Sequence, residues 1–172
     1  MPKQVCYISP VGMLGGGFTE SYFVEACERH PIDFIGVDSG STDGGPIHLG
    51  ADLPINSRDA LKRDLNILVP TARRFNVPLV IGSCGGSGGN ANLAYIADLV
   101  REVAADQRLT FNLATIQAEP TRDFLIERYR AGRFHALENA PSIDESTLRD
   151  ARRIVAMMGP EPIAEAVAAG AD

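Results

Sequence analysis

Three clusters of glycine are the strongest sign of a binding site in this sequence. They contain Gly12, Gly15, Gly16 and Gly17, then Gly40, Gly44, Gly45 and Gly50, then Gly82, Gly85, Gly86, Gly88 and Gly89. Each cluster follows a short apolar run that is typical of a β-strand. Because glycine costs chain entropy on folding, such clustering favours a close approach of the backbone to a ligand. The alternative interpretation is that the glycines serve tight turns alone.

The third cluster lies in residues 82–90, which lead from a predicted strand into a predicted helix. Free N–H groups and the positive end of the dipole at a helix start favour an anion, such as a phosphate, a carboxylate or a pyrophosphate. No Lys-Ser/Thr pair closes this loop, so it is not a Walker loop. Residues 86–91 match the pattern G-x-G-x-x-A and Glu119 ends the next predicted strand, so a dinucleotide-binding domain is one alternative.

Three polar side chains near the same edge are our candidates for catalysis. Asp38 comes directly after an apolar strand, where a carboxylate can act as general acid or base, orient a hydroxyl or bind a cation. Turn chemistry is the other interpretation of Asp38. His48 lies in the same long loop and is a candidate for proton transfer or binding. Glu119 either lines the site or caps the helix that begins after Thr121.

The predicted ligand-binding residues come from the three loops. They are Gly15, Gly16, Ser39, Ser41, Thr42, Ser83, Cys84, Gly85, Gly86, Ser87, Gly88 and Asn90. Cys84 could also be a nucleophile at a helix start, but no histidine can be placed beside it, so we prefer to interpret it as a small space-filling residue. A divalent cation could be held by four side chains of this edge, although nothing fixes their distances, so no metal site is assigned. These four are Asp38, Asp43, His48 and Glu119.

The elements that must position these residues alternate along the chain. Apolar runs predict strands at residues 3–9, 33–37, 77–81, 110–116 and 153–157. Helices are expected at residues 20–29, 57–75, 91–106, 121–131, after the capping box 142–145, and at 160–169. Pro70 should kink or split the second of these helices. The pattern predicts an α/β fold of alternating β-α units, with a mostly parallel sheet flanked by helices in three layers. We prefer an open sheet to part of a barrel.

Bulk properties set limits on partners and location. The 172 residues fit a single domain spanning residues 1–172, and 45% of them are hydrophobic. A net charge of −6 without a Lys/Arg cluster argues against nucleic acid and anionic membranes. No apolar run reaches the ~18 residues that span a bilayer, and residues 1–5 lack the core of a signal peptide. Three cysteines without metal spacing fit a reducing compartment, so we predict a cytoplasmic protein.

Four contiguous motifs resemble the opening of a known family. They are Ile8–Gly15, Gly36–Pro46, Lys62–Leu65 and Ile81–Gly88, and residues 154–159 with 168–172 resemble a further block. The family is the acyclic terpene utilisation (AtuA-like) family. The resemblance implies a bacterial catabolic setting linked to acyclic terpenes and acyl-CoA chemistry, and it carries over no catalytic residue. Family members look longer, so we expect this chain to be the N-terminal part of a longer protein.

Together these observations predict a protein that binds a small anionic metabolite, a carboxylate or an acyl-CoA, at the carboxyl edge of its sheet. Lyase, hydratase or isomerase chemistry is expected, because no redox or phosphoryl-transfer signature is present. A non-catalytic binding or assembly subunit is the alternative, acting as a homo-oligomer or with a partner subunit. A divalent cation and the CoA moiety remain open as cofactors, and none is assigned.

Overall fold

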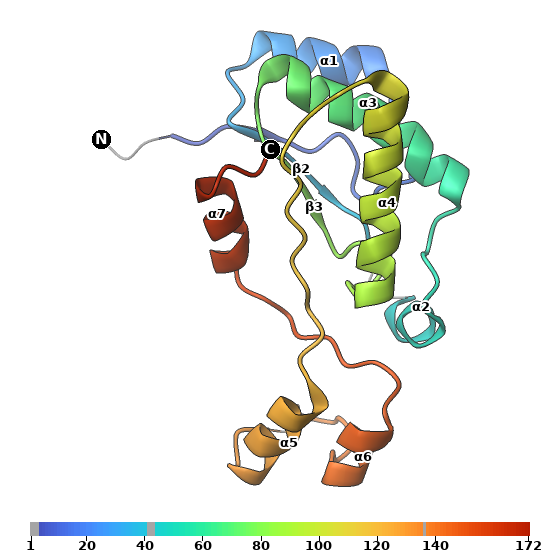
Figure 1. Ribbon diagram of the computed structural model, residues 1–172, viewed down its shortest axis with the longest axis vertical. Helices are drawn as coiled ribbons and strands as arrows, with labels where there is room; N and C mark the ends of the chain where they lie inside the picture. Colours follow the sequence, from blue (N-terminus) through green and yellow to red (C-terminus); the bar gives the residue numbers. More distant parts are fainter. Residues whose placement is uncertain (1–3, 41–43, 136) are drawn as a thin grey trace.

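The structure, a computed structural model, describes residues 4–40, 44–135 and 137–172 (Figure 1). Its strands are β1 (Tyr7–Ile8), β2 (Phe34–Asp38) and β3 (Leu79–Gly82). Its helices are α1 (Glu20–Arg29), α2 (Gly45–Ala51), α3 (Arg58–Phe75), α4 (Asn90–Gln107), α5 (Arg122–Arg130), α6 (Glu145–Asp150) and α7 (Glu161–Ala168). None of the helices in the described part of the chain combines the length and the apolar character that a membrane crossing needs.

The strands form a small, open, parallel sheet in the order β1-β2-β3. This arrangement confirms the α/β class and the parallel pairing. Ile35 and Val37 of β2 are buried, whereas Phe34 and Asp38 alternate with them on the other face. The sheet therefore has one face inside the main core and one face turned away from it.

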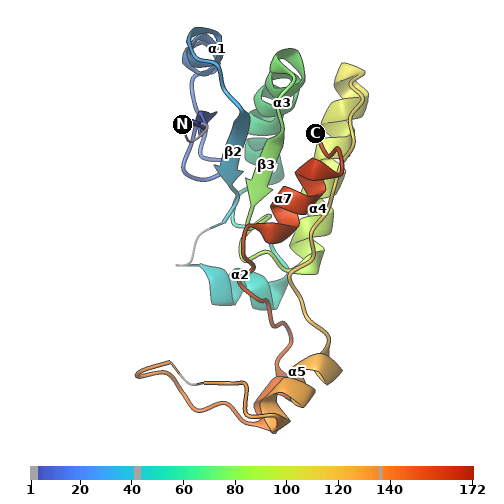
Figure 2. The ribbon, with the colours of Figure 1, turned by 90° about the vertical axis from the view of Figure 1, so that its left-hand side faces the viewer.

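Helices α1, α3 and α4 lie on the buried side of the sheet, and α7 lies on the other side of β3 (Figures 1 and 2). Parallel strands in sequential order, joined by the usual right-handed crossovers, place their connecting helices on one face. The main core joins that face to α1, α3 and α4 through the buried side chains of Phe23, Ile35, Leu65, Leu68 and Val103. Helices α5 and α6 pack on each other, away from the sheet (Figure 1).

Pro70 does not split its helix, because α3 runs without a break from Arg58 to Phe75. Proline lacks the N–H that would bond the carbonyl four residues earlier, which is that of Asn66. The side chain of Gln107 supplies the missing donor, since its Nε2 lies 3.1 Å from the Asn66 carbonyl oxygen. A tertiary contact from α4 thus replaces the lost helical hydrogen bond, and the expectation of a split was wrong.

The predicted strands at residues 110–116 and 153–157 are extended but do not join the sheet. A backbone hydrogen bond of 2.7 Å from Ala156 N to Ala118 O links the two stretches, and Asp172 N bonds Asn112 O at 3.0 Å. The sheet is therefore smaller than the alternation of apolar runs predicted. Residues 113–116 and Ala118 line an open cavity instead of pairing with β3, and residues 112–115 stay exposed, so the burial that an apolar run predicts is not found here.

Two local boundaries also differ from the prediction. The long loop after β2 contains the helix α2, which begins at Gly45 and has a proline in its first turn. Helix α6 begins after Asp144 rather than Ser142, because the Asp144 carboxylate accepts from Thr147 N at 2.7 Å and from two hydroxyl groups. An ionised carboxylate that accepts three hydrogen bonds is a stronger cap than the predicted serine.

Candidate functional site

The loops after the three strands meet at the carboxyl edge of the sheet. We call them loop 1 (residues 9–19), loop 2 (residues 39–40) and loop 3 (residues 83–89). Leu14 N of loop 1 donates to the carbonyl of Asp38 at 2.7 Å. Gly85 N of loop 3 donates to Ser39 Oγ in loop 2 at 3.1 Å, and the Ser39 side chain is only 2% exposed. The three loops are thus one hydrogen-bonded unit.

Loop 1 is held by Asp64, a buried carboxylate on α3 that our sequence analysis did not single out as a functional residue. Asp64 is 0% exposed, and its Oδ2 accepts from Gly15 N at 2.8 Å and from Gly17 N at 3.1 Å. Arg63 Nε bonds the other oxygen at 2.9 Å. Its position in the sequence could have indicated that Asp64 is buried, because it lies three residues after Leu61 within the apolar stripe of α3.

Close packing explains several of the glycines. A Cβ atom at Gly40 would lie 1.8 Å from the Gly86 carbonyl oxygen, and one at Gly15 would lie 2.6 Å from Asn56 Cβ. At Gly85, whose φ is +71°, a Cβ would lie 3.0 Å from that of Asn92. These glycines are needed because loops and helices pack directly on one another. No ligand is required to account for them.

Gly82 and Gly88 differ from these glycines. A Cβ at Gly82 would meet only the Val37 carbonyl oxygen, at 4.0 Å, and one at Gly88 would meet only the backbone of Ser83, at 3.9 Å. Both residues line a cavity instead of a packed contact. Gly88 has a φ of +72°, which by itself favours glycine, so of these two cavity-lining glycines only Gly82 is distinguished by open space alone.

The cavity has a volume of about 630 Å³ and lies between β3, one face of α4, the extended residues 113–118 and α7. Its walls are largely apolar, with Leu93, Ile96 and Val100 from α4 facing Leu113 and Ile163. Its volume falls within the range of about 300–1,000 Å³ that small-molecule sites occupy. Six of the predicted site residues line it, namely Asp38, Ser83, Cys84, Gly86, Ser87 and Gly88.

Asp38 and Ser83 supply polar groups on the cavity wall. Asp38 ends β2 with an exposed side chain whose Oδ1 accepts from Gly40 N at 2.9 Å. Ser83 follows β3 with a φ of +47°, a left-handed conformation that is uncommon for a residue with a side chain. Asp52, Asn76 and Arg108 share this conformation as helix C-caps, but Ser83 does not end a helix. Ser83 is therefore held in an unusual conformation at the cavity.

The Cys84 thiol is not set up as a nucleophile. Burial, together with the nearby charge of Asp38, raises its pKa from the usual 9.0 to about 11. The sulfur lies 3.5 Å from the Ile81 carbonyl oxygen, to which the thiol donates. A thiol that is protonated at neutral pH fits the space-filling role preferred from the sequence.

His48, Gly15 and Gly16 do not line this cavity within the described part of the chain. His48 lies on α2, where its Nδ1 is 3.3 Å from the carbonyl oxygen of Leu53. Gly15 and Gly16 belong to loop 1, on the α3 side of the edge. Ser41, Thr42 and Asp43 lie outside the described residues.

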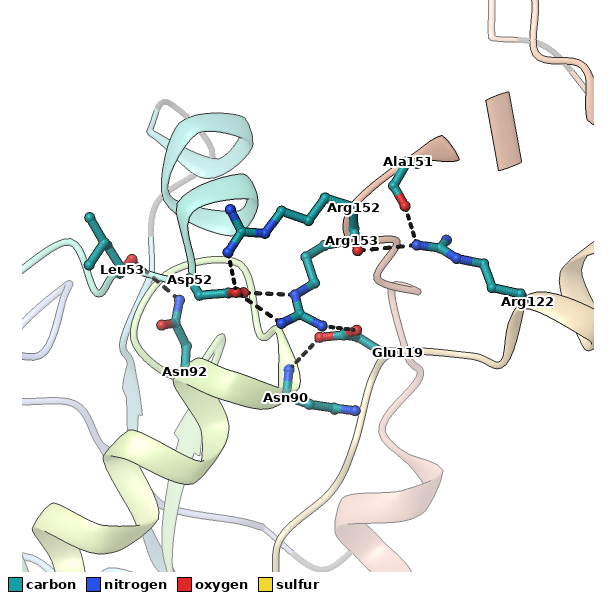
Figure 3. A network of polar contacts seen from close by, with 9 residues as sticks. All are labelled: Asp52, Leu53, Asn90, Asn92, Glu119, Arg122, Ala151, Arg152 and Arg153. Carbon is teal, nitrogen blue, oxygen red and sulfur yellow. Dashed lines mark hydrogen bonds and ion pairs between the residues drawn. The ribbon is translucent and has the colours of Figure 1, made fainter. Parts of the chain in front are cut away.

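Glu119 caps helix α4 (Figure 3). Its Oε1 accepts from Asn90 N at 2.7 Å, and its Oε2 lies 3.5 Å from Arg153 Nη1. Arg153 also bonds both oxygens of Asp52, at 2.7 and 2.9 Å, and Arg152 adds a third contact at 2.9 Å. These hydrogen bonds from the two arginines lower the pKa of Asp52.

This network affects the prediction that loop 3 binds an anion, either a small anion or the pyrophosphate of a dinucleotide. Helix α4 has no cap from its own first residues, so Glu119 supplies the negative charge at its start. The N–H of Asn90 is thereby bonded, and it is one of the groups that a pyrophosphate at this helix start would use. The match to a dinucleotide pattern therefore has no support from the geometry.

A second hollow of about 510 Å³ lies beside the cavity. Arg152 and Arg153 line it together with Pro46 and Leu49 of α2. Ser87 and Val155 line both the hollow and the cavity, so the two spaces adjoin at loop 3. The hollow thus brings two cationic side chains, Arg152 and Arg153, close to the cavity, and the sequence analysis did not select them.

No group of three or more His, Cys, Asp or Glu side chains within residues 4–40, 44–135 and 137–172 could hold a metal ion. Asp38, His48 and Glu119 belong to three different settings: the cavity wall, helix α2 and the cap of α4. The fourth residue considered, Asp43, lies outside the described residues.

Fold and site together define an α/β protein with a parallel sheet and an apolar cavity at its carboxyl edge. Comparisons with family models, with curated proteins and with solved structures match this chain to none of them. Its function is therefore argued from the site.

Proposed function

We propose that this chain binds a small anionic metabolite with an apolar body, a carboxylate or an acyl-CoA, at the carboxyl edge of its sheet. The observation that carries the proposal is the apolar cavity that adjoins an arginine-lined hollow at loop 3. A ligand of this class needs both an apolar enclosure and cationic donors for its charged group. The resemblance to the AtuA-like family supports a catabolic setting with acyl-CoA chemistry.

The chemistry that we propose is of the lyase, hydratase or isomerase type, with Asp38 as the residue that moves a proton. Asp38 lies on the cavity wall, and the N–H of Gly40 fixes one of its oxygens at 2.9 Å. An oriented carboxylate beside a bound carbon chain can act as general base or acid. In this proposal Glu119 positions loop 3 through Asn90 N, and His48 supports α2, instead of touching the ligand.

A thermal-shift titration tests this proposal. We would compare octanoate, octanoyl-CoA and CoA, because a ligand that binds only the folded chain raises its melting temperature by mass action. Asp38→Asn should abolish turnover of the thioester while binding persists. Asp98→Asn, which changes an exposed carboxylate on α4, is the matched control. Absence of a shift with all three ligands would contradict the proposal.

A non-catalytic assembly subunit is the second candidate, and the exposed face of the sheet favours it. Tyr7 is 64% exposed and stacks on Phe34 of the neighbouring strand, with ring centroids 5.1 Å apart. Parallel sheets normally have both faces covered. A homo-oligomer or a partner subunit would cover this face. Light scattering of the purified chain tests this, because Tyr7→Asp should then dissociate an assembly that the unaltered chain forms.

Two finer aspects of the fold and location are part of the same proposal. The three-layer α/β arrangement that the sequence predicts is supported by α7, which lies on the side of the sheet opposite to α1, α3 and α4. A cytoplasmic location is proposed because Cys6, Cys27 and Cys84 are free thiols.

A further inference from the structure

The outer edge of β3 carries backbone groups that the sheet does not use. Ile35 N donates to Pro78 O at 2.9 Å, and Ser39 N donates to Gly82 O at 2.8 Å. In a parallel ladder both polar groups of a residue point to the same side, and the side alternates along the strand. Pro78, Val80 and Gly82 therefore face β2, whereas the N–H and C=O groups of Leu79 and Ile81 face away from it.

This outer edge borders the cavity rather than another strand. All residues from 78 to 82 line the cavity, and residues 113–118 form its opposite wall without pairing to β3. The Ile81 carbonyl oxygen accepts a hydrogen bond from the Cys84 thiol. For the remaining outward groups, the N–H and C=O of Leu79 and the N–H of Ile81, the described residues provide no hydrogen bond. These groups lie on half-buried residues, and an unpaired strand edge of this kind can accept a further hydrogen-bonding partner.

We propose that the free edge of β3 binds an extended ligand through secondary amides, and that this ligand is the pantetheine arm of an acyl thioester. This inference rests on the proposed function, which places an acyl-CoA or a carboxylate in the same cavity. A pantetheine arm is a flexible chain with two secondary amides. The N–H and C=O of each amide point in opposite directions, so each amide can form one hydrogen bond with a strand edge.

The edge presents outward polar groups at two positions. Leu79 and Ile81 are two residues apart, which places their outward groups about 6.6 Å apart along the strand. A chain with two amides can bond at both positions while its methylene groups contact Leu93 and Ile96 of α4. The strand then leads to Gly82, which is paired in register with Asp38. An arm lying along β3 would thus carry its thioester to the carboxylate that we propose for proton transfer.

Hydrogen exchange on the unaltered chain is the first test. Saturating pantetheine or octanoyl-CoA should slow exchange of the Leu79 and Ile81 amides by at least about tenfold, because they gain acceptors. The amides of Val80 and Gly82 already face β2 and should not change, so the same strand contains its own control. Octanoate has no amide and should leave all four rates unchanged.

A pair of variants at one position supplies the second test. Leu79→Pro removes the outward N–H, and prolines are tolerated where an edge strand has no partner. Leu79→Ala removes the same side chain but keeps the N–H. The Leu79→Pro chain should bind pantetheine about fivefold more weakly than the Leu79→Ala chain, the factor expected for one neutral hydrogen bond. Both variants should bind octanoate equally.

The outcomes separate this inference from the proposed function. If octanoyl-CoA raises the melting temperature but Leu79 and Ile81 exchange as before, the edge inference is overturned and the proposed function stands. If no thioester or carboxylate binds, the proposed function fails first. If a blocked apolar tripeptide protects these amides and pantetheine does not, the edge binds peptides and the thioester assignment is wrong.

Discussion

Replacing Gly40 and Gly82 separately by alanine tests whether glycine is required at the two positions for different physical reasons, close packing at Gly40 and open space at Gly82. At Gly40 the added Cβ would lie 1.8 Å from the Gly86 carbonyl oxygen and 2.7 Å from Ser83 Cβ. Both contacts involve loop 3, whose backbone is tied to Ser39 and to the end of β3. The loop would have to move away for the variant to fold.

The expected cost follows from these contacts. Overpacking a well-packed site costs about 1–3 kcal/mol, and a backbone oxygen cannot rotate away as a side chain can, so we expect about 3 kcal/mol for Gly40→Ala. The methyl group of Gly82→Ala meets only the Val37 oxygen at 4.0 Å. That variant should be unchanged or more stable by about 0.4–1 kcal/mol, because alanine restricts the unfolded chain. The two variants should therefore differ by about 3–4 kcal/mol.

Urea denaturation followed by circular dichroism measures this difference, provided that the m-values agree. Binding of octanoyl-CoA to the folded Gly82→Ala chain is the second readout, and it should weaken because the new methyl group occupies the cavity. Equal stability of the two variants would refute the packing argument for Gly40. Unchanged binding by Gly82→Ala would refute the argument that a ligand approaches this glycine.

Three further expectations follow from single groups. Asp64→Ala should lower the free energy of unfolding by about 2–5 kcal/mol, because the N–H groups of Gly15 and Gly17 lose their acceptor, while Asp64→Asn should cost less in the same urea assay. Arg130 of α5 and Arg149 of α6 lower the pKa of Glu145 from 4.5 to about 2, and the Arg130 ion pair stabilises the α5–α6 contact above pH 4.5. That stabilisation should be lost as the pH falls toward 2, and hydrogen exchange of the α5 and α6 amides measures it. In the Glu145→Gln chain this pH dependence should be absent. Alkylation of Cys84 by iodoacetamide at pH 8 should be about 100-fold slower in the folded chain than in guanidinium, because a pKa near 11 leaves little thiolate, and equal rates would contradict it.

The sequence predicted best what depends on neighbouring residues. Apolar spacing located α1, α3, α4 and α5, and the cap of α5 at Thr121 accepts from Phe124 N at 3.3 Å as expected. The meeting of the three glycine loops followed from parallel pairing alone, since parallel strands bring their carboxyl ends to one edge. These features could be predicted without knowing which distant residues are in contact.

Features that depend on distant contacts were missed. The continuity of α3 through Pro70 depends on Gln107, which lies 37 positions further along the chain and whose side chain replaces the lost donor. The cap of α4 comes from Glu119, and the arginines of the hollow come from residues 152–153, so neither could be read from local spacing. Asp64 was overlooked because aspartate is usually solvent-exposed, and the two backbone N–H groups that bind its buried carboxylate come from loop 1, far away in the sequence.

The two extended stretches that failed to pair show why the candidate site lies where it does. An apolar run predicts burial in a sheet, but residues 113–115 are exposed on the wall of an open cavity. Because residues 113–118 form a wall instead of a fourth strand, the edge of β3 keeps its polar groups facing an apolar space. A chain that filled this space with its own strand would have a more complete sheet but no cavity beside Asp38. The same departure from the predicted sheet therefore accounts for the cavity, the free backbone groups and the open surroundings of Gly82.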